Sequence, residues 1–322
     1  MTASLQQRTE CVSGIETVAV VGMGALGVMF ADRIVQHIGP DKLCFLMDGA
    51  RLARRGDGAC RVNGAELRFR VRRPEDVGPV DLLIFATKFG GLAEAMDQID
   101  PAVGEDTVII SLLNGIITED ILAERYGRAR VVDCVAIGMD AMREGSEITY
   151  QNMGRLQIGA RVPEQGRALE QLAVFLARAG VPFELPADII RAMWNKFMIN
   201  VGINQTCMVY GVPYAVARGG GEAYASMVAA MREVIPLARA EGVHLTEEDL
   251  KSDLQLLAGL NPDGYPSMRQ DALAGRRSEL ELFAGTVLRL ARRHGLPAPV
   301  NARYCAAILE MERDLPARPA EG

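Results

Sequence analysis

The stretch Thr17-Val18-Ala19-Val20-Val21-Gly22-Met23-Gly24-Ala25-Leu26-Gly27 decides the fold of this chain. Its β-branched and apolar first half predicts a short buried strand, and the apolar spacing over residues 26–36 predicts a helix directly after the glycines. A G-x-G-x-x-G pattern placed between a strand and a helix is typical of dinucleotide binding. We therefore predict that a dinucleotide-binding fold begins here, with a plain glycine-rich turn as the alternative.

Each glycine of this pattern has a distinct physical role. Gly22 permits a tight turn, Gly24 lets the backbone approach a pyrophosphate, and Gly27 lets the helix pack closely on the strand. The phosphates are then expected at the helix N-terminus, where backbone N–H groups point at them. The expected cofactor-binding loop consists of Gly22, Met23, Gly24, Ala25, Leu26 and Gly27.

Asp48 follows the second expected strand, 21 positions after the last glycine of the loop. An acidic residue about 20 positions on usually binds the ribose hydroxyl of NAD and repels the 2′-phosphate of NADP. Arg51, Arg54 and Arg55 follow at once, and arginines can hold that phosphate. The alternative is that Asp48 caps a short helix and that the arginines are solvated. On these residues alone, NAD and NADP both stay open.

Strand and helix patterns alternate over residues 16–185, which predicts an α/β domain with a parallel sheet and crossover helices, a dinucleotide-binding Rossmann domain. Asn63-Gly64 within an alternating stretch predicts a hairpin. Residues 148–151 and 156–160 are expected to form an extra pair of strands. The other expected strands are 17–21, 43–47, 81–87, 107–113, 130–137 and 181–185, and the expected helices are 26–36, 92–99, 119–126 and 163–179.

From Pro186 the pattern becomes helical and is interrupted by glycine and proline. We place the domain boundary there and expect residues 186–315 to form an all-helical substrate and catalytic domain. Two domains also suit a chain of 322 residues, at about 100–200 residues per domain. The helices expected are 187–209, 221–241, 246–257, 267–274, 278–294 and 299–313.

The bulk composition argues against several classes of protein. A net charge of −6 and a pI near 5.3 disfavour a nucleic-acid partner, which normally requires a basic face. None of the six cysteines forms a C-x-x-C pair or has a histidine at metal-ligand spacing, so we expect no disulfide framework and no metal site. The N-terminus lacks the basic region of a secretory signal, and the apolar run 18–30 is too short to span a bilayer. We expect a cytoplasmic protein that does not engage a membrane.

If the expected dinucleotide is a nicotinamide that delivers a hydride to a carbonyl, the reaction also requires a proton donor. Histidine is a common donor because its pKa suits neutral pH. The three histidines, His37, His244 and His294, are better interpreted as surface or capping residues. Another group is therefore expected to donate the proton.

Lys196, Asn200 and Asn204 are spaced i, i+4, i+8 in an otherwise apolar helical segment. At this spacing they share one helix face. Asparagine is a poor helix former, so two of them on one face require an explanation. The functional interpretation is a polar strip in which the lysine acts as the acid and the amides grip the substrate. The alternative is a partly buried stripe bonded to neighbouring backbone.

Two predicted strands end in polar pairs, Thr87-Lys88 and Asn114-Gly115. Ligands of open α/β sheets bind beyond the carboxyl ends of the strands, so both pairs are expected at the cofactor site. Ordinary turn chemistry is the alternative for each of them. Ser267 begins an S-x-x-Q pattern that predicts a capping box, and such a helix start can also hold a substrate carboxylate. Ser278 and Glu281 form a second predicted box, which leaves Glu279 for another task.

In combination these segments resemble the ketopantoate reductase (2-dehydropantoate 2-reductase) family, from about residue 16 to residue 313. The order and spacing of the matching pieces together carry the resemblance. They are the glycine loop 22–27, Thr87-Lys88, Asn114-Gly115, the segment 194–204, Pro266-Ser267-Met268-Arg269-Gln270-Asp271 and Ser278-Glu279-Leu280-Glu281.

The resemblance implies a Rossmann domain followed by a helical domain like that of 6-phosphogluconate dehydrogenase. It implies reduction of ketopantoate to pantoate by NAD(P)H, a step of pantothenate and coenzyme A biosynthesis. NADP(H) is the cofactor of the family, with NAD(H) as the alternative that Asp48 supports. The resemblance implies Lys196 as the general acid, Glu279 as its support, and Asn114, Asn200, Asn204 and Ser267 as substrate-binding residues. It places Lys88 and Asn114 at the cofactor beside the glycine loop, whereas Asp48 is expected there from its position after the second strand.

The chain departs from the family pattern at two points. Family members that use NADPH usually have an arginine where this chain has Asp48, and Gly264 stands where a polar residue is usual near the serine. The alternatives to ketopantoate reduction are reduction of another 2-keto acid and a non-catalytic nicotinamide-binding sensor. The expected partners are a small-molecule keto acid and, in a homodimer, a second copy of the chain.

Overall fold

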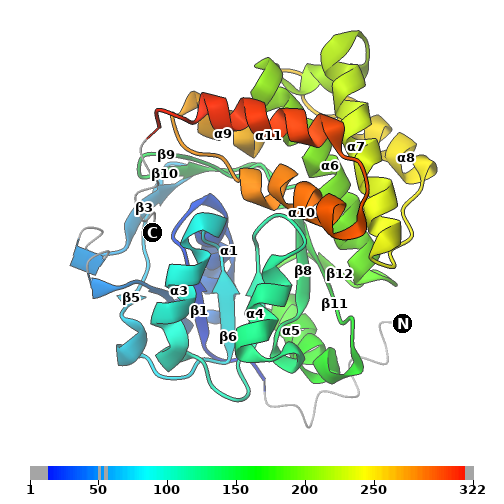
Figure 1. Cartoon of the computed structure of the whole chain (residues 1–322). Coiled ribbons are helices and arrows are strands. Elements are labelled where there is room, and N and C mark those ends of the chain that lie inside the picture. The colour runs from blue at the N-terminus through cyan, green and yellow to red at the C-terminus, as the bar shows by residue number, and fades with distance from the viewer. Residues whose placement is uncertain (1–13, 50–51, 54–56, 316–322) are drawn as a thin grey trace. The chain divides into compact units, whose positions relative to one another are not determined.

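The computed structural model describes residues 14–49, 52–53 and 57–315, so Arg51, Arg54 and Arg55 lie outside the described residues. The described chain folds into two compact units (Figure 1). The first unit runs to Leu113 and continues from Thr118 to Ile189. The second unit begins at Ile190 and also includes Asn114–Ile117, a grouping that the sequence does not predict.

A five-stranded parallel sheet, in the order β5-β2-β1-β6-β7, forms the centre of the first unit. The first strand lies in the middle, where Val18 is paired with Leu43 on one side and with Leu82 on the other. This parallel arrangement confirms the expected Rossmann-type fold class. The strands are β1 (Val18–Val21), β2 (Leu43–Leu46), β5 (Val71–Arg72), β6 (Leu82–Phe85) and β7 (Val108–Ser111).

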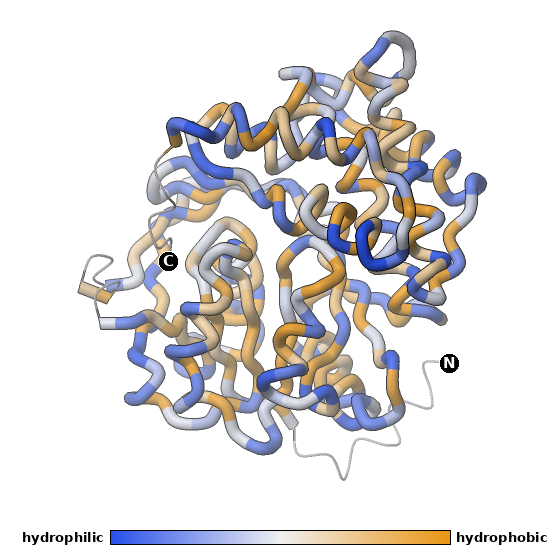
Figure 2. Tube along the Cα trace, in the orientation of Figure 1, coloured by the Kyte–Doolittle hydropathy of each residue, from blue (hydrophilic) through white to orange (hydrophobic). Residues whose placement is uncertain are grey.

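Helices cover both faces of this sheet, because alternate strand residues point to opposite sides. Val18 and Val20 pack with helices α1 (Ala25–Ile38) and α5 (Gly166–Arg178). Ala19 and Val21 pack with α3 (Leu92–Ile99) and α4 (Thr118–Tyr126) on the other face. Figure 2 shows hydrophobic residues gathered along these central strands. The sheet therefore brings the ends of its strands to a common edge, which positions the first part of the site.

Two smaller sheets complete the first unit, in the orders β4-β3-β10-β9 and β12-β11-β8. The predicted hairpin is confirmed, since β3 and β4 pair antiparallel around Asn63 and Gly64, both of which have positive φ. The strands are β3 (Ala59–Val62), β4 (Ala65–Arg68), β8 (Asp133–Ile137), β9 (Met142–Glu144), β10 (Glu147–Thr149), β11 (Arg155–Gly159) and β12 (Phe183–Glu184).

The two extra strands expected at 148–151 and 156–160 are present as β10 and β11, but they do not pair with each other. Strand β10 pairs with β3 and β9, whereas β11 pairs with β8 and β12. Gly154 explains the separation, because its φ is +61° and a Cβ there would lie 2.1 Å from the carbonyl oxygen of Ile137. The chain turns sharply at this glycine and continues against β8 instead of returning along β10.

Helices dominate the second unit, as the sequence predicts. One segment differs from the prediction, because residues 278–294 do not form one helix. They form a short 3-10 turn, Leu280–Leu282, followed by α10, and no side-chain cap begins at Ser278. The helices are α6 (Ile189–Tyr210), α7 (Gly221–Ala240), α8 (Glu247–Ala258), α9 (Ser267–Leu273), α10 (Ala284–His294) and α11 (Pro299–Met311).

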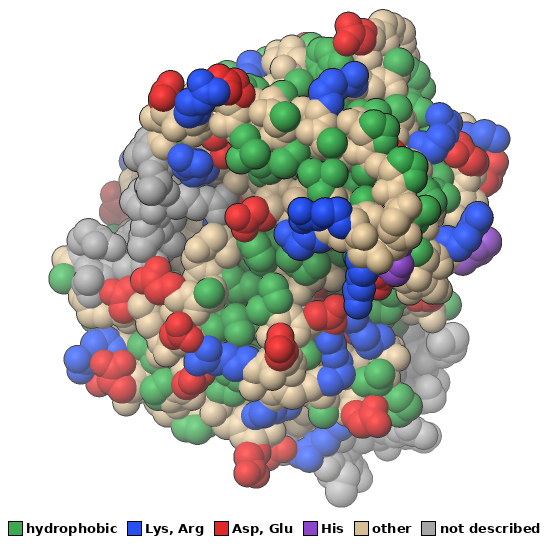
Figure 3. All heavy atoms as spheres, in the orientation of Figure 1, with side chains coloured by type: hydrophobic (Ala, Val, Ile, Leu, Met, Phe, Trp, Pro, Cys, Tyr) green, Lys and Arg blue, Asp and Glu red, His purple; other side chains and the backbone are tan. Residues whose placement is uncertain are grey.

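Three properties of the described residues bear on the class of protein. No helix within them is long and apolar enough to cross a membrane. No group of three or more His, Cys, Asp or Glu residues among them could hold a metal ion. Figure 3 shows basic and acidic side chains interspersed on the face that it displays, so the described residues of that face form no single basic patch.

Candidate functional site

The glycine loop between β1 and α1 is shaped by close backbone contacts. Gly22 has φ of +105°, and a Cβ there would lie 2.6 Å from the carbonyl oxygen of Ala86. A Cβ on Gly27 would lie 2.2 Å from the carbonyl oxygen of Gly22. At Gly24 the nearest atom to an added Cβ is 3.8 Å away. The first two positions therefore require glycine for packing, whereas Gly24 leaves open space above the loop for a ligand.

The loop also leaves polar groups for that ligand. Helix α1 has no acidic residue in its first turn and no side-chain cap at Gly24, so its first N–H groups face an uncapped end. The hydroxyl Oγ1 of Thr87, just past the neighbouring strand β6, is buried and has no hydrogen-bond partner. A Cβ on Gly22 would lie 2.7 Å from the backbone nitrogen of this threonine, so the two segments are adjacent. An open cradle with uncapped N–H groups and an unpaired hydroxyl fits a dinucleotide pyrophosphate.

Arg143 adds a positive charge to this loop. It lies on β9, and its guanidinium donates a hydrogen bond to the carbonyl oxygen of Met23 and another, of 2.8 Å, to that of Gly145. Arg143 is not among the site residues that the sequence predicts. Arg143 and Met23 are 120 positions apart in the sequence, so no local sequence pattern could predict this contact.

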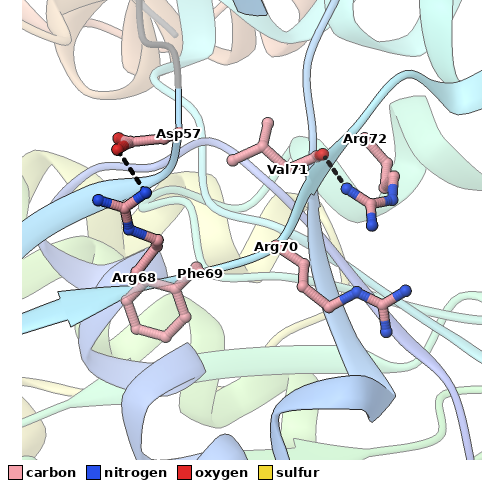
Figure 4. A pocket seen from close by; sticks show the side chains of 6 residues that line it. All are labelled: Asp57, Arg68, Phe69, Arg70, Val71 and Arg72. Atoms are coloured by element: carbon pink, nitrogen blue, oxygen red, sulfur yellow. Dashed lines mark hydrogen bonds and ion pairs between the residues drawn. The ribbon is translucent and has the colours of Figure 1, made fainter.

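Asp48 and Lys88 follow β2 and β6 at the same edge of the sheet, as the sequence predicts for both. Beside β2, the edge strand β5 brings Arg72 into register with Leu46, two positions before Asp48. A cavity of about 340 Å³ next to this strand is lined by Asp57, Arg68, Phe69, Arg70, Val71 and Arg72. Figure 4 shows Arg68 directed at Asp57, while Arg70 and Arg72 extend from the strand in other directions. This edge therefore combines the carboxylates of Asp48 and Asp57 with arginine side chains.

Helix α6 in the second unit carries the predicted polar strip. Lys196 is half-buried, while Asn200 and Asn204 are 9% and 5% exposed. The residues around them, including Phe197 and Met198, are buried. Buried amides require hydrogen-bond partners, so the strip must be satisfied by neighbours or by a ligand.

Asn114 joins the strip to Glu279. Its Oδ1 accepts from Lys196 Nζ at 3.4 Å and from Asn200 Nδ2 at 3.5 Å. Its Nδ2 donates to Glu279 Oε2 at 3.5 Å. All three bonds are long, so they can be exchanged for shorter bonds to a ligand. We call these four residues the Asn114 cluster: Asn114, Lys196, Asn200 and Glu279.

The strip continues from the Asn114 cluster to the beginning of α9. Asn204 Nδ2 donates to Asn200 Oδ1 at 3.3 Å, and Asn204 Oδ1 accepts from Ser267 Oγ at 3.1 Å. The predicted capping box at Ser267 is wrong, because Pro266 occupies the cap position and the serine hydroxyl turns to Asn204 instead. The structure thus brings Lys196, Glu279, Asn114, Asn200, Asn204 and Ser267 into one hydrogen-bonded chain within the second unit.

The histidines lie elsewhere. His37 Nδ1 is 2.9 Å from the carbonyl oxygen of Arg33. His294, the last residue of α10, contacts Glu241 through its ring. Neither contact involves the strip. A lysine ammonium held by an amide oxygen, with a carboxylate bonded to the same amide, can bind a carbonyl oxygen and transfer a proton to it.

Two family models match this chain. Residues 18–163 match "Ketopantoate reductase PanE/ApbA", and residues 188–312 match "Ketopantoate reductase PanE/ApbA C terminal". Together the two matches cover most of both structural units.

Individual relatives agree with these models. The chain is 27% identical over 301 residues to a 2-dehydropantoate 2-reductase of Caulobacter vibrioides, which covers 91% of this chain and 98% of the relative. The solved 2-dehydropantoate 2-reductase of Geobacter metallireducens is 26% identical, with a TM-score of 0.80 over 91% of this chain and 99% of that one. D-mandelate dehydrogenase, solved with NADH and anilino(oxo)acetate, is 22% identical, with a TM-score of 0.82 over 93% and 99% of the two chains.

Proposed function

This chain belongs to the ketopantoate reductase family of oxidoreductases, and we propose from that premise that it reduces 2-dehydropantoate (ketopantoate) to pantoate with NAD(P)H. The observation that carries the proposal is the Asn114 cluster. A single amide oxygen accepts from both Lys196 and Asn200, and the same amide donates to Glu279. Such an arrangement suits a carbonyl that must be held and protonated.

The first unit is proposed to bind the cofactor through residues 22–27, Thr87 and Arg143. The open space at Gly24 and the unpaired hydroxyl of Thr87 support this assignment. When bound, the nicotinamide supplies the hydride. The protein backbone and Arg143 hold the phosphates in place, since N–H groups and a guanidinium are suited to an anion.

The choice between NADPH and NADH is proposed to depend on the end of β2. Asp48 stands where a carboxylate usually binds the ribose hydroxyl, which favours NADH. Arg72 lies in register beside the same strand end and could hold a 2′-phosphate, which favours NADPH. The family resemblance favours NADPH, whereas the solved D-mandelate dehydrogenase of similar fold was bound to NADH.

The second unit is proposed to bind and protonate the keto acid. Lys196 donates its proton to the carbonyl oxygen as negative charge develops there in the transition state. Asn114 and Asn200 orient the lysine and the carbonyl, and Asn204 and Ser267 bind the rest of the acid. Glu279 holds the Asn114 amide in the orientation that presents its oxygen to the lysine.

The test is an absorbance assay at the nicotinamide band with both reduced cofactors and a panel of keto acids. Ketopantoate is expected to have the highest kcat/KM of the panel. The panel includes a phenyl-substituted keto acid because D-mandelate dehydrogenase has a similar fold. A higher kcat/KM for that compound would reassign the substrate to an aryl keto acid. Tight cofactor binding with no turnover of any keto acid would instead identify a sensor.

A homodimer stays a prediction from the resemblance. Sedimentation equilibrium of the purified chain checks it, with a mass of twice 34.9 kDa expected for a dimer.

A further inference from the structure

Arg269 on α9 is half-buried without a counter-ion. Its Nε is enclosed by protein and has no hydrogen-bond partner. Among the described residues its guanidinium forms no hydrogen bond or ion pair with any other group. By contrast, Arg276 pairs with Asp271 at 2.9 Å. Only the Nε is enclosed without a partner, and a group that supplies negative charge to the guanidinium would offset the cost of this partial burial.

The guanidinium lies along the continuation of the polar strip. A Cβ on Gly211, one residue beyond α6, would be 3.6 Å from its terminal nitrogen. Asn204 and Cys207 are spaced i, i+3, so they share one helix face, and Gly211 follows directly after the helix ends. Ser267, two residues before Arg269, bonds to Asn204. Arg269 is therefore placed about one to two helical turns beyond the last amide of the strip.

The Cys207 thiol, which the positive charge of Arg269 affects, and the Tyr214 phenol that interacts with this thiol are both neutral groups. Burial raises the pKa of the Cys207 thiol to about 12, although the positive charge of Arg269 acts in the opposite direction. Burial, with a smaller contribution from Cys207, also raises the pKa of the Tyr214 phenol to about 12. Both groups stay protonated at neutral pH and supply no negative charge. Neither the thiol nor the phenol therefore serves as a counter-ion for Arg269.

We propose that Arg269 binds a carboxylate of the substrate, an inference that rests on the proposed function and specifies the keto acid more closely. A carboxylate matches a guanidinium in charge and in planar, bidentate geometry. Two carboxylates could provide this contact. One is the carboxylate next to the reacting carbonyl, and the other is a second carboxylate at the far end of a longer keto acid.

A structural role for the guanidinium is the competing explanation. A cation near the end of α6 also stabilises the helix dipole. That role predicts a lower thermal midpoint when the charge is removed, with no change in substrate binding. The two explanations are separated by measuring KM, kcat and thermal stability on the same variants.

The experiment compares Arg269→Gln and Arg269→Lys with the wild type, and uses Arg239→Gln as a control. Arg239 is exposed on α7, so its substitution removes the same charge away from the site. We expect Arg269→Gln to raise KM by about 10–100-fold, the usual value of a charged hydrogen bond, with kcat at saturation within about threefold. Arg269→Lys is expected to recover only part of the affinity, because it keeps the charge but loses the bidentate geometry.

Two substrates distinguish the sources of the carboxylate. A rise in KM for ketopantoate, which has one carboxylate, assigns the contact to the group beside the carbonyl. A loss confined to 2-oxoglutarate, which has a second carboxylate, assigns it to the far end. Unchanged KM values for both, with a lowered thermal midpoint, would overturn the proposal in favour of the helix-stabilising role.

A second measurement uses the unsubstituted protein and needs no turnover. Phenylglyoxal modifies accessible arginines, and peptide mapping reports the modification of Arg269 with and without keto acid. Protection of Arg269 by ketopantoate or 2-oxoglutarate, with Arg239 modified equally in both samples, supports the proposal even if no keto acid is reduced. Equal modification of Arg269 in every sample overturns it.

Discussion

The proposed role of Lys196 as proton donor depends on the polar groups around it. This lysine has a long hydrogen bond to Asn114 and stands on a face otherwise occupied by two amides. Positioned acid catalysis is worth about 10²–10⁴-fold in rate, so Lys196→Ala is expected to lower kcat by that factor and to leave cofactor binding nearly intact. Stopped-flow turnover and cofactor titration measure the two effects.

The control for this prediction is Lys196→Arg. Guanidinium does not release its proton, so arginine is not expected to restore kcat although it keeps the charge. The kcat of the wild type should also fall on the alkaline side of its pH profile, as the ammonium form is lost, and that limb should be absent from the alanine variant. A near-normal kcat for Lys196→Ala would refute the assignment of the proton donor.

Gly24 and Gly27 allow the fold and the function of the loop to be separated. Gly24 has space around its α-carbon, so Gly24→Val should fold and fill the region proposed for the pyrophosphate. We expect its cofactor affinity to fall roughly 100-fold, since the backbone can no longer approach the phosphates. Fluorescence titration of NADH and NADPH measures this. Unchanged affinity in a folded variant would remove the loop from the cofactor site.

Gly27→Val is the matched control. A Cβ there would lie 2.2 Å from the carbonyl oxygen of Gly22, so this variant is expected to lose thermal stability as well as affinity. A stable Gly27→Val protein would mean that helix α1 shifts more easily than its packing indicates.

For single residues, the sequence predicts contacts between side chains that are three or four positions apart on one helix. Lys196, Asn200 and Asn204 could be placed on one face from their spacing alone. The bond from Lys196 to Asn114 spans 82 positions, and spacing cannot predict it. The catalytic and substrate-binding residues that the resemblance named do form one hydrogen-bonded chain, whereas Arg143 and Arg269 required the structure. Their functional roles stay predictions.

The ends of β2 and β5 are the element proposed to select between NADH and NADPH. Burial raises the pKa of the Cys44 thiol on β2, and the positive charges of Arg70 and Arg72 lower it. The charges of these two arginines therefore extend to the face of the sheet that bears this thiol. We expect Asp48→Arg to shift the ratio of kcat/KM toward NADPH by about tenfold or more, because it removes a repelling charge and adds a phosphate ligand.

Arg72→Gln should move the same ratio toward NADH, because it removes the cation beside the strand end. Binding of adenosine 2′,5′-bisphosphate and of AMP, measured by calorimetry, separates the phosphate contact from turnover. Arg68→Gln serves as a control, since Arg68 already pairs with Asp57 at 2.7 Å. If neither Asp48→Arg nor Arg72→Gln changes the ratio of kcat/KM for the two cofactors, the 2′-position of the ribose does not contact this edge of the sheet.

At the scale of elements, the sequence predicts the core strands and most helices, because hydrophobic periodicity is a local signal. Strand partners are less predictable. The partners of β10 and β11 depend on Gly154, whose close approach to Ile137 cannot be recognised from the pattern. The expected helix 278–294 fails for a similar reason. Its first residues are fixed by distant groups, such as the Glu312 carboxylate that accepts from the Ser278 backbone N–H at 2.6 Å.

For the molecule as a whole, the free energy of unfolding is expected to depend on Glu119. This α4 residue is 2% exposed, and burial raises its pKa from 4.5 to about 8, with Asp133 and Asp120 adding to the rise and Arg161 opposing it. Between these pH values the folded chain holds a proton that the unfolded chain has released. The free energy of unfolding should therefore fall as pH rises from 4.5 to 8, by at most about 1.4 kcal/mol per pH unit for this group.

Glu119→Gln removes this titration and keeps a neutral side chain of similar size. Its urea midpoint should match that of the wild type near pH 5 and exceed it increasingly toward pH 8. Glu124→Gln, exposed on the same helix, should track the wild type at every pH. A constant offset between Glu119→Gln and the wild type across this range would show that Glu119 titrates equally in both states.

Residues 114–117 belong with the second unit although the chain on both sides of them belongs to the first. This has a consequence for how such chains can recombine. A crossover between two homologous genes near codon 189 would join an Asn114 loop from one parent to the α6 helix of the other. The amide that bonds to Lys196 and Asn200 would then be inherited separately from both. Hybrid genes are expected to retain turnover only when the loop and the helix descend from the same parent. The two units should therefore be inherited together, although the hydrophobic core of each unit does not by itself require this.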